Sequence, residues 1–204
     1  MRRTLFILAL ASAFSTCTSH NKRILILFKG NADIDGDKKT VVLKGGSGLG
    51  EKEVFYSTGD IINLTVTQED NATATVAVKE DGLHFLNTTK DTILGSYQLY
   101  SDPGKASKNS ISQETLRKSI DSLELLIQNK NVSPTNRNFF LAPGQVAKLS
   151  DNVEAFVVTP YHQMTSMEGK DGKAPEVYRF WSIKEIRETI DKLKGFTQAE
   201  APKE

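Results

Sequence analysis

The sequence predicts an α+β fold, in which an N-terminal antiparallel β-sandwich-like domain precedes a smaller α+β part with two amphipathic helices. Two patterns lead to this prediction. Over residues 24–100, short apolar runs recur about every ten residues with turn residues between them, as in sheets that bury one face. Beyond residue 111, apolar residues recur at helical spacing in two segments.

Six or seven strands are expected in the N-terminal part. Ile24–Phe28 is apolar throughout, which is typical of a strand buried on both faces. Separate strands are then expected at Thr40–Leu43 and Val54–Tyr56. The segments 62–66 and 74–78 alternate apolar and polar residues, so each is expected to bury one face.

The C-terminal part is expected to hold two helices with short strands between them. Ser112 or Ser110 is the candidate N-cap of the first helix, and Ser182 with Glu185 forms a capping box for the second. Strands are expected at 145–149, 153–159 and 177–181. Ser150-Asp151-Asn152 is interpreted as a hairpin turn between the first two of these strands.

These elements predict a chain of six segments. They are a signal peptide (1–16), a lipid-anchor linker (17–23), the β-sandwich-like domain (24–100), a polar linker (101–111), the α+β C-terminal domain (112–196) and a polar tail (197–204).

The N-terminus has the pattern of a cleavable export signal. Arg2 and Arg3 precede an apolar run of about ten residues, which is shorter than the roughly 20 that span a bilayer as a helix. Small residues follow and lead to Cys17, the only cysteine. Two processing routes are open: an ordinary signal peptidase acting at Ala11-Ser12-Ala13 would release a soluble secreted protein, whereas lipid attachment at Cys17 would anchor it.

The segment Phe14-Ser15-Thr16-Cys17 resembles the lipobox of bacterial lipoproteins of the signal peptidase II class. Ser15 and Cys17 agree with the usual pattern, and Phe14 and Thr16 depart from it. The second half of the chain resembles uncharacterised Gram-negative cell-envelope lipoproteins. The resemblance implies lipidation of Cys17 and, because Thr18 rather than aspartate follows, an outer-membrane anchor with the body facing the periplasm.

Composition narrows the classes of partner. Without Arg2 and Arg3 the chain carries 24 basic and 25 acidic side chains, so no broad positive surface for nucleic acid is expected. The expected partners are therefore the membrane, through the N-terminal lipid, and an envelope protein or glycan.

One segment suggests a metal. Asn31, Asp33 and Asp35, followed by Gly36, match the start of an EF-hand-type calcium loop, but Val42 stands where the bidentate glutamate is needed. The alternative is a hairpin turn with Asp35-Gly36 at its tip. Calcium is thus a weak candidate ligand, and no other cofactor is expected.

Two further motifs have weaker chemical interpretations. Gly45–Gly50 resembles a phosphate-binding loop, but Glu51 stands in the lysine position, so a flexible loop between strands is expected. His162 is the candidate acid–base group, and no complete catalytic set can be assigned around it. The leading hypothesis is a non-enzymatic binding or structural module of the envelope; the alternatives are a small periplasmic hydrolase around His162 and a calcium-stabilised β module.

Overall fold

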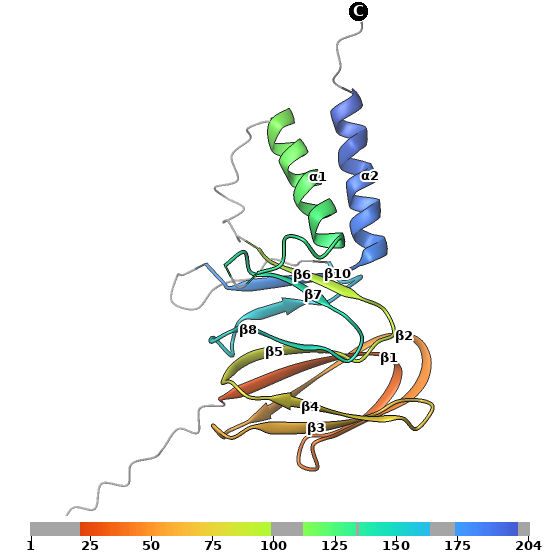
Figure 1. Cartoon of the computed structure of the whole chain (residues 1–204), viewed down its shortest axis with the longest axis vertical. Coiled ribbons are helices and arrows are strands. Elements are labelled where there is room, and N and C mark those ends of the chain that lie inside the picture. The colour runs from red at the N-terminus through yellow and green to blue at the C-terminus, as the bar shows by residue number, and fades with distance from the viewer. Residues whose placement is uncertain (1–20, 99–111, 134, 164–173, 200–204) are drawn as a thin grey trace, which may run out of the picture.

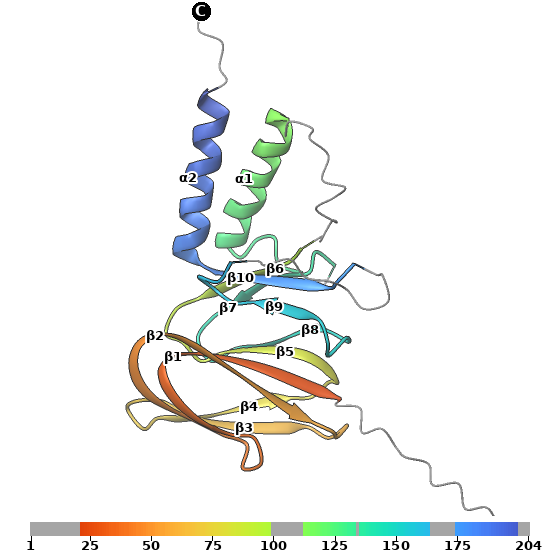
Figure 2. The same ribbon diagram turned by 180° about the vertical axis from the view of Figure 1, so that it is seen from behind.

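The computed structural model describes residues 21–98, 112–133, 135–163 and 174–199. These residues form two β-sheets, one stacked on the other, and two helices that stand on the second sheet (Figures 1 and 2). The α+β class with a β-rich N-terminal part is therefore confirmed.

The first sheet has the strand order β4-β3-β2-β1-β5-β8. Its strands are β1 (Lys22–Asp35), β2 (Thr40–Tyr56), β3 (Ile62–Thr67), β4 (Thr73–Val78), β5 (Gly82–Asn87) and β8 (Val146–Ser150). The second sheet has the order β7-β6-β10-β9. Its strands are β6 (Ile93–Gln98), β7 (Asn138–Leu141), β9 (Phe156–Val158) and β10 (Val177–Ser182).

A long bent hairpin of β1 and β2 shapes the first sheet. The two strands pair antiparallel along most of their length. The start of β1 pairs in parallel with β5, whereas the start of β2 pairs in parallel with β3. Because opposite ends of one hairpin pair with different neighbours, the sheet curls nearly into a barrel. Its interior is an apolar core that includes Ile24, Ile26, Val41, Leu64 and Val78.

Glycines allow this bend of the hairpin. The prediction of a flexible loop at Gly45–Gly50 is wrong. β2 runs unbroken through this segment, so the two strands expected at 40–43 and 54–56 are one. The pairing of β1 with β2 shifts register next to Gly30, which has a φ of 76°. A Cβ on Gly30 would lie 2.2 Å from the carbonyl oxygen of Gly45. Only glycine allows two backbones this close at a positive φ.

The apolar run in β1 is buried on both faces, as expected. Ile24 and Ile26 point into the barrel-like core, and Leu25 and Leu27 point toward the second sheet. Between the sheets, the rings of Phe85 and Phe180 stack with centroids 4.0 Å apart. Because successive side chains of a strand point to opposite faces, β1 contributes to two apolar cores.

The two sequence halves interleave in space. β8 joins the first sheet beside β5, and β6 lies inside the second sheet between β7 and β10. The predicted hairpin at Ser150–Asn152 is wrong because β8 and β9 belong to different sheets. Arg23 helps to hold the crossing segment, since its Nη1 donates to the carbonyl oxygens of Val153 and Ala155 at 2.9 and 3.0 Å.

The two helices are α1 (Gln113–Ile127) and α2 (Ile183–Ala199), and both predicted caps are confirmed. The Thr115 N–H donates to Ser112 Oγ at 3.2 Å. Ser182 N donates to Glu185 Oε2 at 2.8 Å and Glu185 N donates to Ser182 Oγ at 3.2 Å, which is a capping box. α2 continues into the segment expected as a polar tail.

The helices pack side by side and extend away from the outer face of the second sheet, which each helix contacts near one end (Figure 1). Their contact with the sheet is a third apolar core, formed by Leu94, Ile120, Leu126, Ile186 and Ile190. Within the described ranges, neither helix is long and apolar enough to cross a membrane.

Candidate ligand-binding groove

A groove of about 510 Å³ lies between the helix pair and the second sheet. Its floor is formed by residues of β6, β7 and β10, and its walls by residues of α1 and α2. The lining residues are Ser96, Gln98, Thr115, Lys118, Ser119, Ser122, Leu123, Leu126, Asn138, Arg179, Trp181, Ile186 and Thr189. We call this cavity the helix groove.

Strand alternation in β10 delivers two residues to the helix groove. Tyr178 and Phe180 point into the core between the sheets, as their apolar character predicts. Arg179 and Trp181 therefore point to the opposite face, where the helices lie. Trp181 packs against the third core as well, so its ring is held in place.

Arg179 lacks the partners that a half-buried guanidinium usually has. Its carbon lies 5.4 Å from the centre of the Trp181 ring, within the range of a cation–π contact. In the described part of the chain, its Nε is buried without a hydrogen-bond partner, and no carboxylate forms an ion pair with it. A buried polar group left unpaired costs on the order of 1–3 kcal/mol.

The charges that line the helix groove have one sign. Lys118 and Arg179 are basic, and no carboxylate of the described residues belongs to the lining. Lys118 is largely exposed and pairs with Glu114, one turn earlier in α1, at 2.6 Å. Ser122 Oγ accepts from Asn131 Nδ2 at 3.2 Å, which leaves its own proton able to donate to a ligand.

A second cavity of about 830 Å³, the polar cleft, lies where β7 and β8 approach each other. Arg137 Nη2 donates to Glu176 and to the hydroxyl of Tyr178, and Ser150 Oγ donates to Glu176 at 3.0 Å. Arg137 also stacks on the ring of Tyr97. Burial and the hydrogen bond to Glu176 raise the pKa of Tyr178 to about 12. This network satisfies its own charges, in contrast to Arg179.

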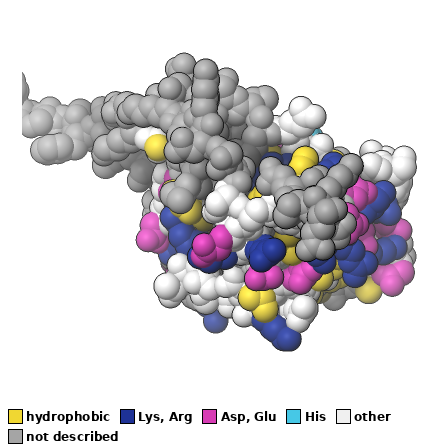
Figure 3. Space-filling model, turned by 90° about the horizontal axis from the view of Figure 1, so that it is seen from above, with side chains coloured by type: hydrophobic (Ala, Val, Ile, Leu, Met, Phe, Trp, Pro, Cys, Tyr) yellow, Lys and Arg dark blue, Asp and Glu magenta, His cyan; other side chains and the backbone are white. Residues whose placement is uncertain are grey.

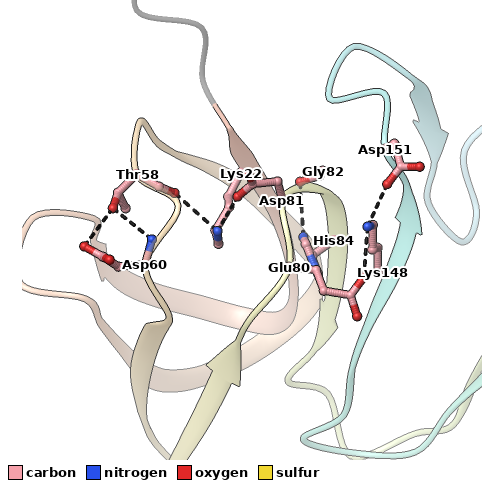
Figure 4. Close-up of polar contacts among 9 residues, drawn as sticks. All are labelled: Lys22, Thr58, Asp60, Glu80, Asp81, Gly82, His84, Lys148 and Asp151. Carbon is pink, nitrogen blue, oxygen red and sulfur yellow. Dashed lines mark hydrogen bonds and ion pairs between the residues drawn. The ribbon is translucent and has the colours of Figure 1, made fainter.

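The polar cleft continues into a set of ion pairs at the edge of the first sheet (Figure 4). Lys148 lies between Glu80 and Asp151, with Nζ–O distances of 2.9 and 2.7 Å. Nearby, Lys22 is fully buried and contacts Asp81 and the carbonyl oxygen of Thr58. These cations are therefore also neutralised by the protein itself.

His162 lies next to a buried hydroxyl. Thr159 Oγ1 donates to Glu51 Oε2 at 2.6 Å and lies 2.6 Å from His162 Nδ1. Since the hydroxyl proton is given to Glu51, its oxygen is the acceptor for Nδ1–H. Thr159 is only 3% exposed, whereas His162 is exposed. The order carboxylate–hydroxyl–imidazole differs from a catalytic triad, in which the imidazole is central.

The three predicted calcium ligands lie on β1. Asp33 pairs with Lys44, and Asp35 accepts from the backbone N–H of Lys38 at 2.9 Å. That hydrogen bond and the Lys38 ammonium lower the pKa of Asp35. Asn31 lies opposite Gly45 in the β1–β2 pairing. Among the residues described, no group of three His, Cys, Asp or Glu side chains is arranged to hold a metal ion.

Glu51 and Glu53 on β2 are the other carboxylates that could complete a calcium site, but they contact Thr159 and Arg23 instead. The turn after Asp35 is a hairpin turn, but its residue with positive φ is Lys39 rather than Gly36. Cys17 lies outside the described residues, so its lipidation stays a prediction.

The unmatched charge of the helix groove is local. Seen from the helix side, acidic and basic side chains are interspersed over the described surface (Figure 3). No protein-family model, no curated protein and no solved structure matches this chain. The assignment of a site therefore depends on geometry and chemistry alone.

Sequence reasoning did not identify Arg179 or the groove around it. A signal was present, because Arg179 interrupts the apolar run from Val177 to Trp181, which otherwise predicts a strand buried on both faces. An arginine in such a run has to meet an anion, an aromatic ring or a water-filled cavity.

Proposed function

We propose that this chain is a lipid-anchored envelope protein, attached through Cys17, whose folded body is a non-enzymatic binding module. The resemblance of residues 14–17 to a lipobox supports the anchor. The membrane and a ligand of the envelope are the proposed partners. The proposal includes a sandwich-like body. The packing of the two sheets through Phe85 and Phe180 supports this description.

The helix groove carries the proposal of a binding role. Among the described residues, it presents a guanidinium that has no carboxylate partner and the hydroxyl donor of Ser122 beside apolar side chains, which is the composition of a ligand site. As far as the structure describes the chain, the lining contains no histidine, cysteine or carboxylate to transfer a proton or attack a substrate. Recognition without chemistry is the role that this lining supports best.

The anchor would hold the first sheet near the membrane. Lys22, the first residue of β1, follows Cys17 by five residues, so an extended connection would reach at most about 18 Å. The helices lie beyond the second sheet, away from the start of β1 (Figure 1). This arrangement supports a helix groove that stays accessible in the periplasm.

Two experiments test this function. Membrane fractionation should find the native chain with outer-membrane lipids and Cys17→Ala in the soluble fraction; unchanged partitioning of the variant would refute the anchor. Chemical-shift mapping by NMR with benzoate, benzylamine and N-acetylglucosamine should move resonances of the helix groove for at least one probe. The binding role is refuted if none of the three perturbs the groove.

The alternative is a small hydrolase around His162, favoured by the contacts of Thr159 with Glu51 and His162. It predicts that the protein hydrolyses p-nitrophenyl acetate and that His162→Ala abolishes turnover without loss of fold. Hydrolysis no faster in the native protein than in the variant would exclude this alternative.

A further inference from the structure

We propose that the helix groove binds an organic anion, with its oxyanion on the Arg179 guanidinium and its ring or apolar portion against Trp181. This inference rests on the proposed binding function and specifies the class of ligand. Carboxylate and phosphate share the required chemistry, since both present paired oxygens to a planar guanidinium.

Electrostatics is the first reason for an anion. The chain as a whole is nearly neutral, yet the described lining of the helix groove includes Lys118 and Arg179 and no acidic residue. Lys118 pairs with Glu114, so the unmatched charge is that of Arg179, which has no carboxylate partner among the described residues. The polar cleft has three acidic and two basic lining residues, and Arg137 and Lys148 both have carboxylate partners there. A cavity with unmatched positive charge concentrates anions and excludes cations.

Unused hydrogen-bond donors are the second reason. The Nε of Arg179 is buried and unpartnered among the described residues. Ser122 accepts a hydrogen bond from Asn131, and its own proton is given no acceptor among the described residues. A ligand that satisfies these two groups must supply acceptors, and a charged oxygen is the strongest acceptor available.

The apolar part of the lining limits the remainder of the ligand. Trp181, Leu123 and Ile186 line the groove and belong to one apolar cluster, and Trp181 lies next to the guanidinium. A volume of about 510 Å³ is within the range of small-molecule sites. A small inorganic ion would leave this region unfilled, so the ligand is expected to combine an oxyanion with a ring or a short apolar chain.

Trp181 makes the test direct because it is the only tryptophan in the chain. Its emission is titrated with benzoate and phenylphosphonate, and with benzamide as the neutral isostere of benzoate. Both anions should bind with dissociation constants on the order of 1 mM, and benzamide at least about tenfold more weakly. The two anions also distinguish carboxylate from phosphate ligands.

Matched variants assign the effect to one side chain. Arg179→Met should weaken benzoate binding by about tenfold or more, because it removes the guanidinium that pairs with the oxyanion. Arg179→Lys keeps the charge without the planar fork and should give an intermediate loss. Arg187→Met removes the same charge from the exposed side of α2, outside the groove lining, and should leave binding unchanged.

Collisional quenching gives a second readout that needs no tight ligand. Relative to free N-acetyltryptophanamide, iodide should quench Trp181 at least about twice as well as caesium at low ionic strength. Arg179→Met should reduce this preference, and Arg187→Met should not. Circular dichroism of each variant confirms that it is folded.

The proposal is overturned if benzamide binds as tightly as benzoate, or if Arg179→Met retains benzoate affinity. It is also overturned if Trp181 emission is unchanged at about ten times the expected dissociation constant. Binding of benzamide or N-acetylglucosamine in the groove would leave the proposed binding function intact, whereas a groove that binds no probe would refute both.

Discussion

The guanidinium carbon of Arg137 lies 3.9 Å from the centre of the Tyr97 ring, while its Nη2 donates to Glu176 and Tyr178. Arg179 has a comparable aromatic neighbour in Trp181 but no acid among the described residues. The fold thus provides hydrogen-bond partners for Arg137, whereas Arg179 keeps a donor without a partner among the described residues. This difference leads to opposite predictions for stability.

Arg137→Met should lower the free energy of unfolding by about 2 kcal/mol, because Glu176 would lose the cation that neutralises it. Arg179→Met should leave stability unchanged or raise it by up to about 1 kcal/mol, since it removes an unpaired buried donor. Urea unfolding followed by circular dichroism measures both. An equal loss in the two variants would make Arg179 a structural residue.

Gly30→Ala should destabilise the fold by about 3 kcal/mol, because the new Cβ would lie 2.2 Å from Gly45 O at a positive φ. Gly59→Ala is the control, because no atom of the described residues, apart from its chain neighbours, lies within 4 Å of the position that its new methyl group would take, and a change under about 0.5 kcal/mol is expected. Thermal unfolding compares the two. A stable Gly30→Ala variant would show that the bend does not need a close backbone approach.

His84 should make stability depend on pH below neutrality. Burial lowers the pKa of His84 below its ordinary 6.5, and Lys148 and Lys22 act in the same direction, against Gly82 O and Glu80. The unfolded chain then binds the proton first, so stability is full above pH 6.5 and falls as pH decreases from there. The slope cannot exceed about 1.4 kcal/mol per pH unit.

The check is the difference in unfolding free energy between the native protein and His84→Gln from pH 7.5 downward. The native protein should lose stability relative to the variant below pH 6.5. Parallel curves for the two proteins would contradict the buried, neutral state of His84.

Asp81→Ala should cost about 2 kcal/mol, because the fully buried Lys22 would keep only the Thr58 carbonyl as a partner among the described residues. The exposure of Asp81 keeps this figure below that of a fully buried pair. Lys22→Met should cost less than Asp81→Ala, since it removes the buried charge itself. A double-mutant cycle by urea unfolding measures the coupling, and additive effects would show that the pair is not energetically linked.

Calcium should produce no heat in isothermal calorimetry at millimolar concentration, because Asp33 and Asp35 are already neutralised by Lys44 and Lys38. The control is the same injection into Asp33→Asn. A saturable heat that the variant lacks would establish the calcium-stabilised module instead.

Local chemistry explains which elements could be predicted. Each helix begins at the serine that its sequence indicates, because a cap is a contact between residues three apart. The expected burial of Ile24–Phe28 on both faces is confirmed. It could be predicted because a strand without polar residues has no face suited to contact with water. The continuity of β2 could not be predicted, because glycines normally indicate a turn. Here they allow a bend within one strand, and only the contact with the opposite strand shows this.

The sequence by itself determined the α+β class, the caps of both helices, the double burial of the β1 segment and the expectation of a lipid anchor at Cys17. All of these depend on residues close together in the chain. Only the tertiary structure decided that β6 and β8 interleave the two halves, that Thr159 lies between Glu51 and His162, and that Arg137 has an acid whereas Arg179 has none among the described residues. The physical reason is that pairing, burial and charge neutralisation between distant segments depend on which faces meet, and residue spacing along the chain does not specify that.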